Sequence, residues 1–383
     1  ASELKPKLDK YLKEKNIPEL KELFGAKENL PYKLSVMSKD RRVLCKKEGE
    51  NGKVDFPTFF GNIKVPKRKE YVICDDIELR FISFHQNLLE VISNNIAEFM
   101  FYTNFGTRQS KGFGSFYVRN NDQENLYKDP CLFKRPYFCV DESNYEDELQ
   151  KYEALFNYID LFYKTLRSGI NYQGFYFKSL LFSYVKNKCW TWDKKVYKST
   201  FLDKEVLDEQ IEKHGSSDVL TYVTDKKYLV RDLLGLAAVQ QYSSYTKNLN
   251  SKLYNYSIEY DEKNDIKRFK SPLLFKPILN EEGNRFKVFL IVNEIPDDIF
   301  RKPFSVNYYE TEKETKDGKV TKNKKKVGNL TIFTPDNFDL KDYLNFALRN
   351  FQKNTINKDH RFYIMISNIY ADLERSIKNG CEF

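Results

Sequence analysis

The sequence has few of the side chains that carry most enzymatic chemistry. Its 383 residues include only three histidines, three methionines and two tryptophans. The six cysteines lie far apart and form no CxxC pair, so neither a zinc site nor a disulfide framework is indicated. The sequence shows no signal peptide and no apolar run of transmembrane length. We therefore expect reduced thiols in a cytoplasmic protein that needs no metal, cofactor or membrane.

What the sequence does contain is ample material for a folded core. Hydrophobic residues make up 41% of the chain and aromatic residues 16%, which is enough for two domains and argues against disorder. Lysine and arginine together number 64 against 55 acidic residues, a net charge of +9. This modest excess is compatible with binding nucleic acid or an acidic surface, although many soluble proteins carry as much.

Hydrophobic periodicity predicts an α+β protein. The expected elements of the first part are helical pieces within 4–24, strands at 31–45, 71–84 and 115–119, and a helix at 86–102. Those of the second part are a helix at 145–166, a helix or strand at 175–185, an ambiguous helical stretch at 200–234, strands at 253–260, 271–279, 286–293 and 361–367, a polar hairpin at 306–333 and a helix at 339–353. The spacing is unlike that of a doubly wound parallel sheet, so we divide the chain into domains 1–145 and 146–383.

A glycine-rich loop carries the strongest functional signal. It runs from Gly106 to Ser115 and combines three glycines with polar, basic and aromatic side chains, namely Gly106, Arg108, Gln109, Ser110, Lys111, Gly112, Phe113 and Gly114. The glycines permit close approach of a ligand to the main chain. The basic and polar side chains can donate hydrogen bonds to phosphate, and the phenylalanine can stack on a base or fill the core.

The position of this loop between a helix and a strand narrows the choice of anion. Nucleotide-binding loops run from a strand to a helix, so that phosphate meets the positive end of the helix dipole. Here the preceding helix presents its electronegative end, which argues against ATP or NAD. RNA backbone then remains the plausible anion, held by Arg108 and Lys111. The alternative is a tight connection with incidental charges.

The loop, written FGTRQSKGFGSF, resembles the glycine-rich loop of the RAMP superfamily of CRISPR proteins. Within it, the chain is most similar to the first subunit of the Cmr-type (type III-B) effector complex. Further stretches that resemble the family in the same order are 23–25, 166–169, 177–181, 234–236 and 268–273. Ala237 replaces an expected proline, and 300–335 has no counterpart that we can place. The arginine- and tryptophan-rich opening of the family is absent, so we expect a missing N-terminal element.

The resemblance implies two ferredoxin-like, RRM-related domains with helical insertions. It further implies binding to guide RNA and target RNA, at the end of the complex that holds the 3′ part of the guide, alongside other effector subunits. The resemblance also implies that a different subunit of such complexes cleaves the target. The residues that the family match adds to the RNA-binding prediction are Arg167, Lys178, Arg268, Lys270 and Ser271.

Basic clusters elsewhere extend the predicted RNA path. Arg41 and Arg42 close the strand at 31–45, and Lys67 and Arg68 lie in the loop that follows. These side chains can contact phosphate together with Arg108. A solvated surface is the alternative for any one of them.

Two other functions stay open. His85 precedes the helix at 86–102 and is the sole histidine that the sequence offers as acid or base for a metal-independent ribonuclease that processes guide RNA. The second alternative is a protein-interaction module with a vestigial loop. We favour a non-catalytic RNA-binding subunit, because a structural role is the simpler reading of His85.

Overall fold

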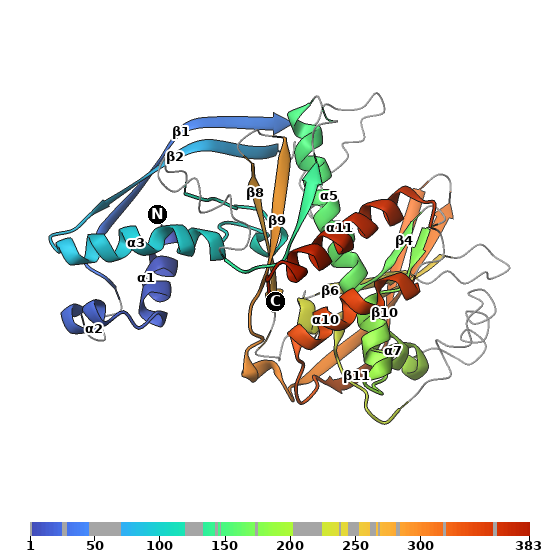
Figure 1. The fold of residues 1–383 in the computed structure, drawn as a ribbon. Helices are drawn as coiled ribbons and strands as arrows, with labels where there is room; N and C mark the ends of the chain where they lie inside the picture. The colour runs from blue at the N-terminus through green and yellow to red at the C-terminus, as the bar shows by residue number, and fades with distance from the viewer. Residues whose placement is uncertain are drawn as a thin grey trace. The chain divides into compact units, whose positions relative to one another are not determined.

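The computed structural model of the chain describes fifteen stretches of sequence (Figure 1). These are residues 2–24, 29–45, 70–118, 133–141, 145, 147–172, 175–201, 224–236, 239–243, 253–260, 266, 269–280, 284–316, 319–354 and 358–383. The chain folds as two compact units, and each draws on separated segments. Unit 1 comprises 1–163, 274–291 and 361–383, and unit 2 comprises 164–273 and 292–360. The sequence-based division was a single cut near residue 145.

Unit 1 combines helices with two antiparallel sheets. Its elements are α1 (Leu4–Glu14), α2 (Pro18–Phe24), β1 (Lys33–Cys45), β2 (Glu70–Ile82), α3 (Gln86–Tyr102), the 3-10 turn η1 (Gln109–Lys111), β3 (Tyr137–Asp141), most of α5 (Glu148–Arg167), β8 (Leu273–Leu279), β9 (Arg285–Val292) and α11 (Arg361–Lys378). Strands β1 and β2 form a long two-stranded ribbon, and the second sheet has the order β3-β9-β8. Pairing of β3 with β9 joins segments that lie far apart in the sequence.

The core of unit 1 forms where apolar helix faces meet. Leu8 and Leu12 of α1 are fully buried in one cluster with Leu88, Ile92 and Phe99 of α3. Apolar residues recur on α3 every three or four positions, which brings them to one face of the helix. This packing holds α1 beside α3, and therefore beside the loop that follows α3.

Unit 2 is built around a four-stranded antiparallel sheet with the order β11-β10-β7-β6. Its elements are β4 (Ile170–Tyr172), β5 (Phe175–Phe177), α6 (Leu180–Asn187), α7 (Asp193–Phe201), η2 (Arg231–Leu234), β6 (Val239–Ser243), β7 (Leu253–Tyr260), η3 (Asp297–Ile299), β10 (Pro303–Lys316), β11 (Lys319–Phe333), α10 (Leu340–Asn350) and η4 (Phe351–Asn354). The predicted hairpin is thus confirmed as β10 and β11. Its predicted turn, Asp317-Gly318, lies outside the described residues.

Most predicted elements are present. Of the stretch predicted as helical at 200–234, residues 202–223 lie outside the described residues, and 224–234 contain only the 3-10 turn η2 as helical structure. Two further stretches differ from the prediction. The stretch 361–367, predicted as a strand, is the start of α11, because the buried residues Ile366, Ile369 and Leu373 follow helical spacing that continues past residue 367. In the stretch predicted as a strand at 115–119, Ser115 makes one isolated bridge with Asn104 and 116–118 are irregular. The mixed, antiparallel architecture agrees with the α+β class. In the part of the chain that is described, no helix is long and apolar enough to cross a membrane.

Candidate nucleic-acid interface

The glycine-rich loop of unit 1 is a closed turn that leaves α3 and returns beside its own start. Asn104 and Ser115 form an antiparallel bridge, and the Phe105 N–H donates to the Gly114 carbonyl oxygen at 2.9 Å. Between these ends the chain makes the single turn η1 and adopts positive φ at Gly106, Arg108, Gly112 and Gly114. Four left-handed residues in nine explain why the sequence places glycine at three of them.

The three glycines of the loop have different structural roles. A Cβ on Gly114 would lie 1.8 Å from the Phe105 carbonyl oxygen, and one on Gly112 would lie 3.1 Å from the Ile159 side chain. These two positions are therefore glycine because the loop packs tightly against itself and against α5. A Cβ on Gly106 would meet nothing within 4 Å, so this position is glycine because of its positive φ and not because of close packing.

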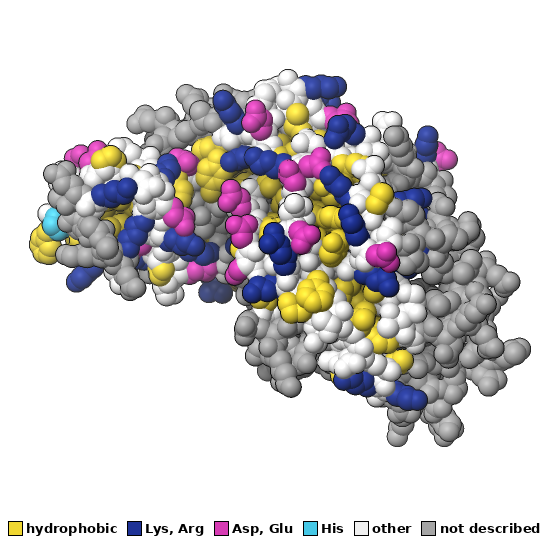
Figure 2. Space-filling view, turned by 90° about the horizontal axis from the view of Figure 1, so that it is seen from below, with side chains coloured by type: hydrophobic (Ala, Val, Ile, Leu, Met, Phe, Trp, Pro, Cys, Tyr) yellow, Lys and Arg dark blue, Asp and Glu magenta, His cyan; other side chains and the backbone are white. Residues whose placement is uncertain are grey.

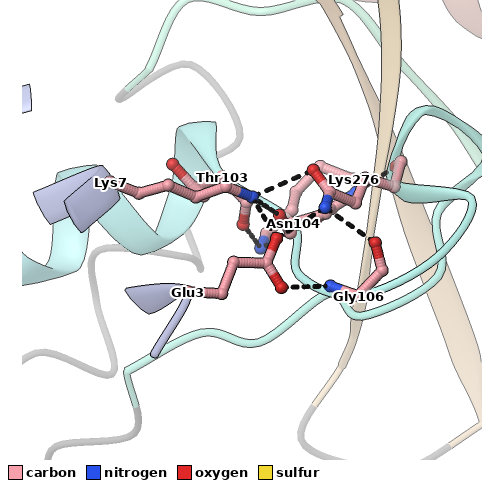
Figure 3. Close-up of polar contacts among 7 residues, drawn as sticks. Glu3, Lys7, Thr103, Asn104, Gly106 and Lys276 are labelled. Atoms are coloured by element: carbon pink, nitrogen blue, oxygen red, sulfur yellow. Dashed lines mark hydrogen bonds and ion pairs between the residues drawn. The ribbon is translucent and has the colours of Figure 1, made fainter. Parts of the chain in front are cut away.

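A buried lysine holds the base of the loop. Lys276 of β8 is fully buried, and its ammonium donates to the carbonyl oxygens of Phe116 (2.6 Å) and Thr103 (3.1 Å) and to Asn104 Oδ1 (3.3 Å). Asn104 in turn donates to the carbonyl oxygens of Gln109 and Phe275. Burial lowers the pKa of Lys276. This network fixes both ends of the loop to β8 (Figure 3).

Helix α1 reaches the loop through two charged side chains (Figure 3). Glu3 accepts hydrogen bonds from the Gly106 N–H at 2.8 Å and from Gln109 Nε2 and Lys7 Nζ at 2.6 Å each. Lys7 also donates to Gln109 Oε1 and to the Asn104 carbonyl oxygen, both at 2.9 Å. Partial burial opposes ionisation of Glu3, but these bonds and the Lys7 charge lower its pKa overall.

The two cations that the sequence analysis placed on phosphate have different surroundings. Arg108 is half-buried in the left-handed conformation at the start of η1, and burial lowers its pKa. The Lys111 ammonium is buried and lies over the Tyr163 ring of α5. In this conformation Arg108 is therefore the better placed of the two to meet a ligand.

Phe113 turns into an aromatic stack. Its ring lies 3.9 Å from that of Phe156 and nearly parallel to it, and the Tyr71 ring lies 5.7 Å from Phe156 and 6.2 Å from Phe113. Of the two roles considered for Phe113, base stacking or core filling, this geometry is that of core filling. Ser110 is half-buried between Gln109 and Lys111.

The other predicted contacts of unit 1 are exposed or paired. Arg41 is exposed on β1. Arg42 forms ion pairs with Asp75 and, at 2.7 Å, with Glu148. Lys67 and Arg68 lie outside the described residues. Arg42 thus ties the β1–β2 ribbon to the start of α5 and has two carboxylates already beside it.

The predicted contacts of unit 2 include one that is plainly structural in this conformation. Arg167 donates to Asp232 Oδ1 at 3.1 Å and to the carbonyl oxygens of Gly235 and Arg231. Lys178 lies over the Phe182 ring, Lys270 is exposed, and the buried Ser271 accepts from the Leu273 N–H. Arg268 lies outside the described residues.

His85 lies at the wrong end of a helix for catalysis at the loop. It occupies the N-terminal flank of α3, whose 17 residues separate it from Thr103. At 1.5 Å of rise per residue that separation is about 25 Å. The loop and His85 therefore do not form one acid–base site within unit 1.

Charges of both signs are interspersed among the described residues on the face shown in Figure 2. Unit 1 also has exposed or half-buried ion pairs such as Lys15–Glu98 and Lys39–Glu78. A mixed surface attracts a polyanion less than a basic patch does. Binding of RNA at the loop would then depend on particular donors and not on a broad positive field.

Sequence reasoning did not single out Lys276, Glu3 or Lys7. A signal existed for Lys276, since a single lysine inside the apolar stretch Leu273–Leu279 must find acceptors if it is buried. No local pattern connects Glu3 with Gly106, which lies 103 residues further along the chain, or Lys7 with Gln109, which lies 102 residues further. Their role depends on the packing of α1 against α3.

Comparison with known proteins gives matches to two family models. The model of the Cmr1 N-terminal domain matches residues 1–170, and that of the Cmr1 C-terminal domain matches residues 176–378. No curated protein and no solved structure gave a significant match. Together the two models span nearly the whole chain, including the glycine-rich loop.

Proposed function

The chain belongs to the Cmr1 family of type III-B CRISPR effector subunits, and on that premise we propose that it binds RNA through the glycine-rich loop without catalysing a reaction. The observation that carries this proposal is the exposed main chain at Gly106, which has open space at its Cβ position and whose N–H already binds an anionic group, the Glu3 carboxylate. Main-chain N–H groups and an arginine side chain are donors that proteins direct at phosphate. Gly106 and Arg108 supply both kinds within three residues.

The bound RNA would be the guide. The resemblance to RAMP proteins supports a position at the end of the complex that holds the 3′ part of the guide, near the 5′ part of the target, in contact with other subunits in the cytoplasm. It also supports ferredoxin-like domains, and the antiparallel β3-β9-β8 sheet with α11 packed on β3 is compatible with such a fold. Sugar–phosphate contacts from such domains read shape more than sequence.

A non-catalytic role is the second part of the proposal. The separation of His85 from the loop along α3 supports it. Incubation of labelled repeat RNA with the pure protein tests this part directly. Defined cleavage that disappears in His85→Ala would establish the ribonuclease alternative instead.

The RNA-binding part is tested by titrating single-stranded RNA with the wild-type protein and the Arg108→Ala variant. Loss of one charge-assisted bond to phosphate predicts about tenfold weaker binding. The matched control is Arg80→Ala, which removes an exposed arginine from β2 of the same unit. We expect the control to bind within about twofold of wild type. If both variants weaken binding equally, the loop is no specific site, and the vestigial-loop alternative is favoured.

A further inference from the structure

Three donors of unit 1 converge on one carboxylate at the glycine-rich loop. They are the Gly106 N–H, the Gln109 side-chain amide and the Lys7 ammonium, all within 2.8 Å of a Glu3 oxygen. They belong to the main chain, to a neutral side chain and to a charged side chain, and each is a common donor to phosphate oxygens. Figure 3 shows Glu3 between Gly106 and Lys7.

We propose that these donors form a phosphate subsite, which the Glu3 carboxylate fills in the free chain and which a phosphate of the bound RNA takes over. The inference rests on the proposed function. It adds that the Glu3 carboxylate competes with an RNA phosphate for the same donors. RNA binding at the loop would then include displacement of an internal anion, and Glu3 would set the affinity.

The donors are held in place independently of Glu3. Lys7 keeps its bonds to Gln109 Oε1 and to the Asn104 carbonyl oxygen. Asn104 is fixed by Lys276 and by the Phe275 carbonyl oxygen, and Gln109 also donates to the Gly106 carbonyl oxygen at 2.7 Å. Departure of the carboxylate therefore leaves a preorganised set of donors, which is what favours binding of a new anion.

Glu3 itself can leave at little structural cost. It precedes the first turn of α1 and its side chain makes no capping hydrogen bond to the helix. The side chain remains 41% exposed, so water can solvate the carboxylate once it turns outward. Nothing would meet an added Cβ on Gly106 within 4 Å, so no other side chain covers the main chain there once Glu3 has turned away.

The test compares single-stranded RNA binding by wild type, Glu3→Ala and the matched control Glu14→Ala. Glu14 is an exposed acid near the other end of α1, so its removal makes the same change of net charge away from the loop. Glu3→Ala should bind RNA about threefold to tenfold more tightly, since one more charge-assisted contact becomes available. The dependence of log affinity on log salt should steepen by about 0.7, the value for one added phosphate on a single strand.

A second arm separates phosphate recognition from a general gain in positive charge. Inorganic phosphate, added at matched ionic strength with chloride as reference, should compete with RNA more strongly against Glu3→Ala than against wild type. Equal gains in Glu3→Ala and Glu14→Ala, or no preference for phosphate over chloride, would overturn the subsite. Weaker RNA binding by Glu3→Ala would also overturn it, because Glu3 would then be a clamp that the loop requires. If no form of the protein binds RNA, the proposed function itself fails.

Discussion

The ammonium of Lys276 lies 3.3 Å from the side-chain oxygen of Asn104, in the fully buried base of the glycine-rich loop. Lys276→Met should lower the free energy of unfolding by about 2 kcal/mol, because it leaves buried acceptors without a donor. Urea denaturation measures this difference. The control is Lys10→Met, which changes a 76% exposed lysine of α1. Equal stabilities of the two variants would show that the buried ammonium does not hold the loop.

Two glycines of the loop should differ in their tolerance of a side chain. Gly114→Ala places a Cβ 1.8 Å from the Phe105 carbonyl oxygen and should lower the free energy of unfolding by about 3 kcal/mol. Gly106→Ala meets open space and carries only the left-handed strain at φ +76°, a cost of about 1–2 kcal/mol. Thermal and urea unfolding of both variants test the order. A reversed order would mean that the loop has a different conformation.

Arg108 and Lys111 should separate binding from stability. Arg108→Ala is expected to weaken RNA binding about tenfold. Lys111→Ala removes an ammonium packed on the Tyr163 ring, so it should lower the free energy of unfolding by about 1–2 kcal/mol. Its RNA affinity should stay within about twofold of the wild-type value. Parallel denaturation and binding titrations distinguish the two effects. The opposite assignment would require Lys111 to turn outward when RNA binds.

Arg167 should behave as a structural residue. Its side chain is 18% exposed, and its partner Asp232 is 4% exposed. Arg167→Ala leaves a buried carboxylate and two carbonyl groups without their donor, which predicts a loss of about 3 kcal/mol. Arg167→Lys should not restore stability, because a single ammonium cannot reproduce the forked contacts. Normal stability of Arg167→Ala, together with weak RNA binding, would return Arg167 to the RNA path.

The bond between Glu3 and the loop should depend on pH. Its lowered pKa in the folded protein means that its contribution is present above the unfolded value of about 4.3 and is lost as pH falls through the folded pKa. Because the side chain is substantially exposed, the contribution at pH 7 is below about 1 kcal/mol. The difference in unfolding free energy between wild type and Glu3→Gln should therefore shrink to zero in strongly acidic buffer. A difference that grows with acid would contradict the ion pair.

Elements whose hydrophobic pattern is local could be predicted from the sequence, whereas pairings between distant segments could not. Helix α3 and strands β1 and β2 were predicted within one or two residues, because their periodicity is local. The partnership of β3 with β9 was not, since no local pattern records which distant strand will pair. The start of α11 was misread as a strand because a seven-residue apolar window fits both periods.

The same limit applies to the candidate site. Composition identified the loop and its glycines, since positive φ has a clear residue preference. Composition could not tell Arg108 from Lys111, because the difference lies in the position of Tyr163 on α5. Nor could it assign Arg167, whose acceptors come from 231–235 and meet it only in the folded chain.

The proposed contact between Arg108 and a phosphate of the guide RNA can be tested by a double-mutant cycle in the assembled effector complex. Guides carrying a single neutral methylphosphonate are compared for binding to complexes with wild-type or Arg108→Ala subunits. We predict one position, in the 3′ part of the guide, where the neutral linkage weakens the wild-type complex but not the variant. If every substituted guide weakens both complexes by the same factor, Arg108 contacts no phosphate of the guide, which contradicts the proposed site.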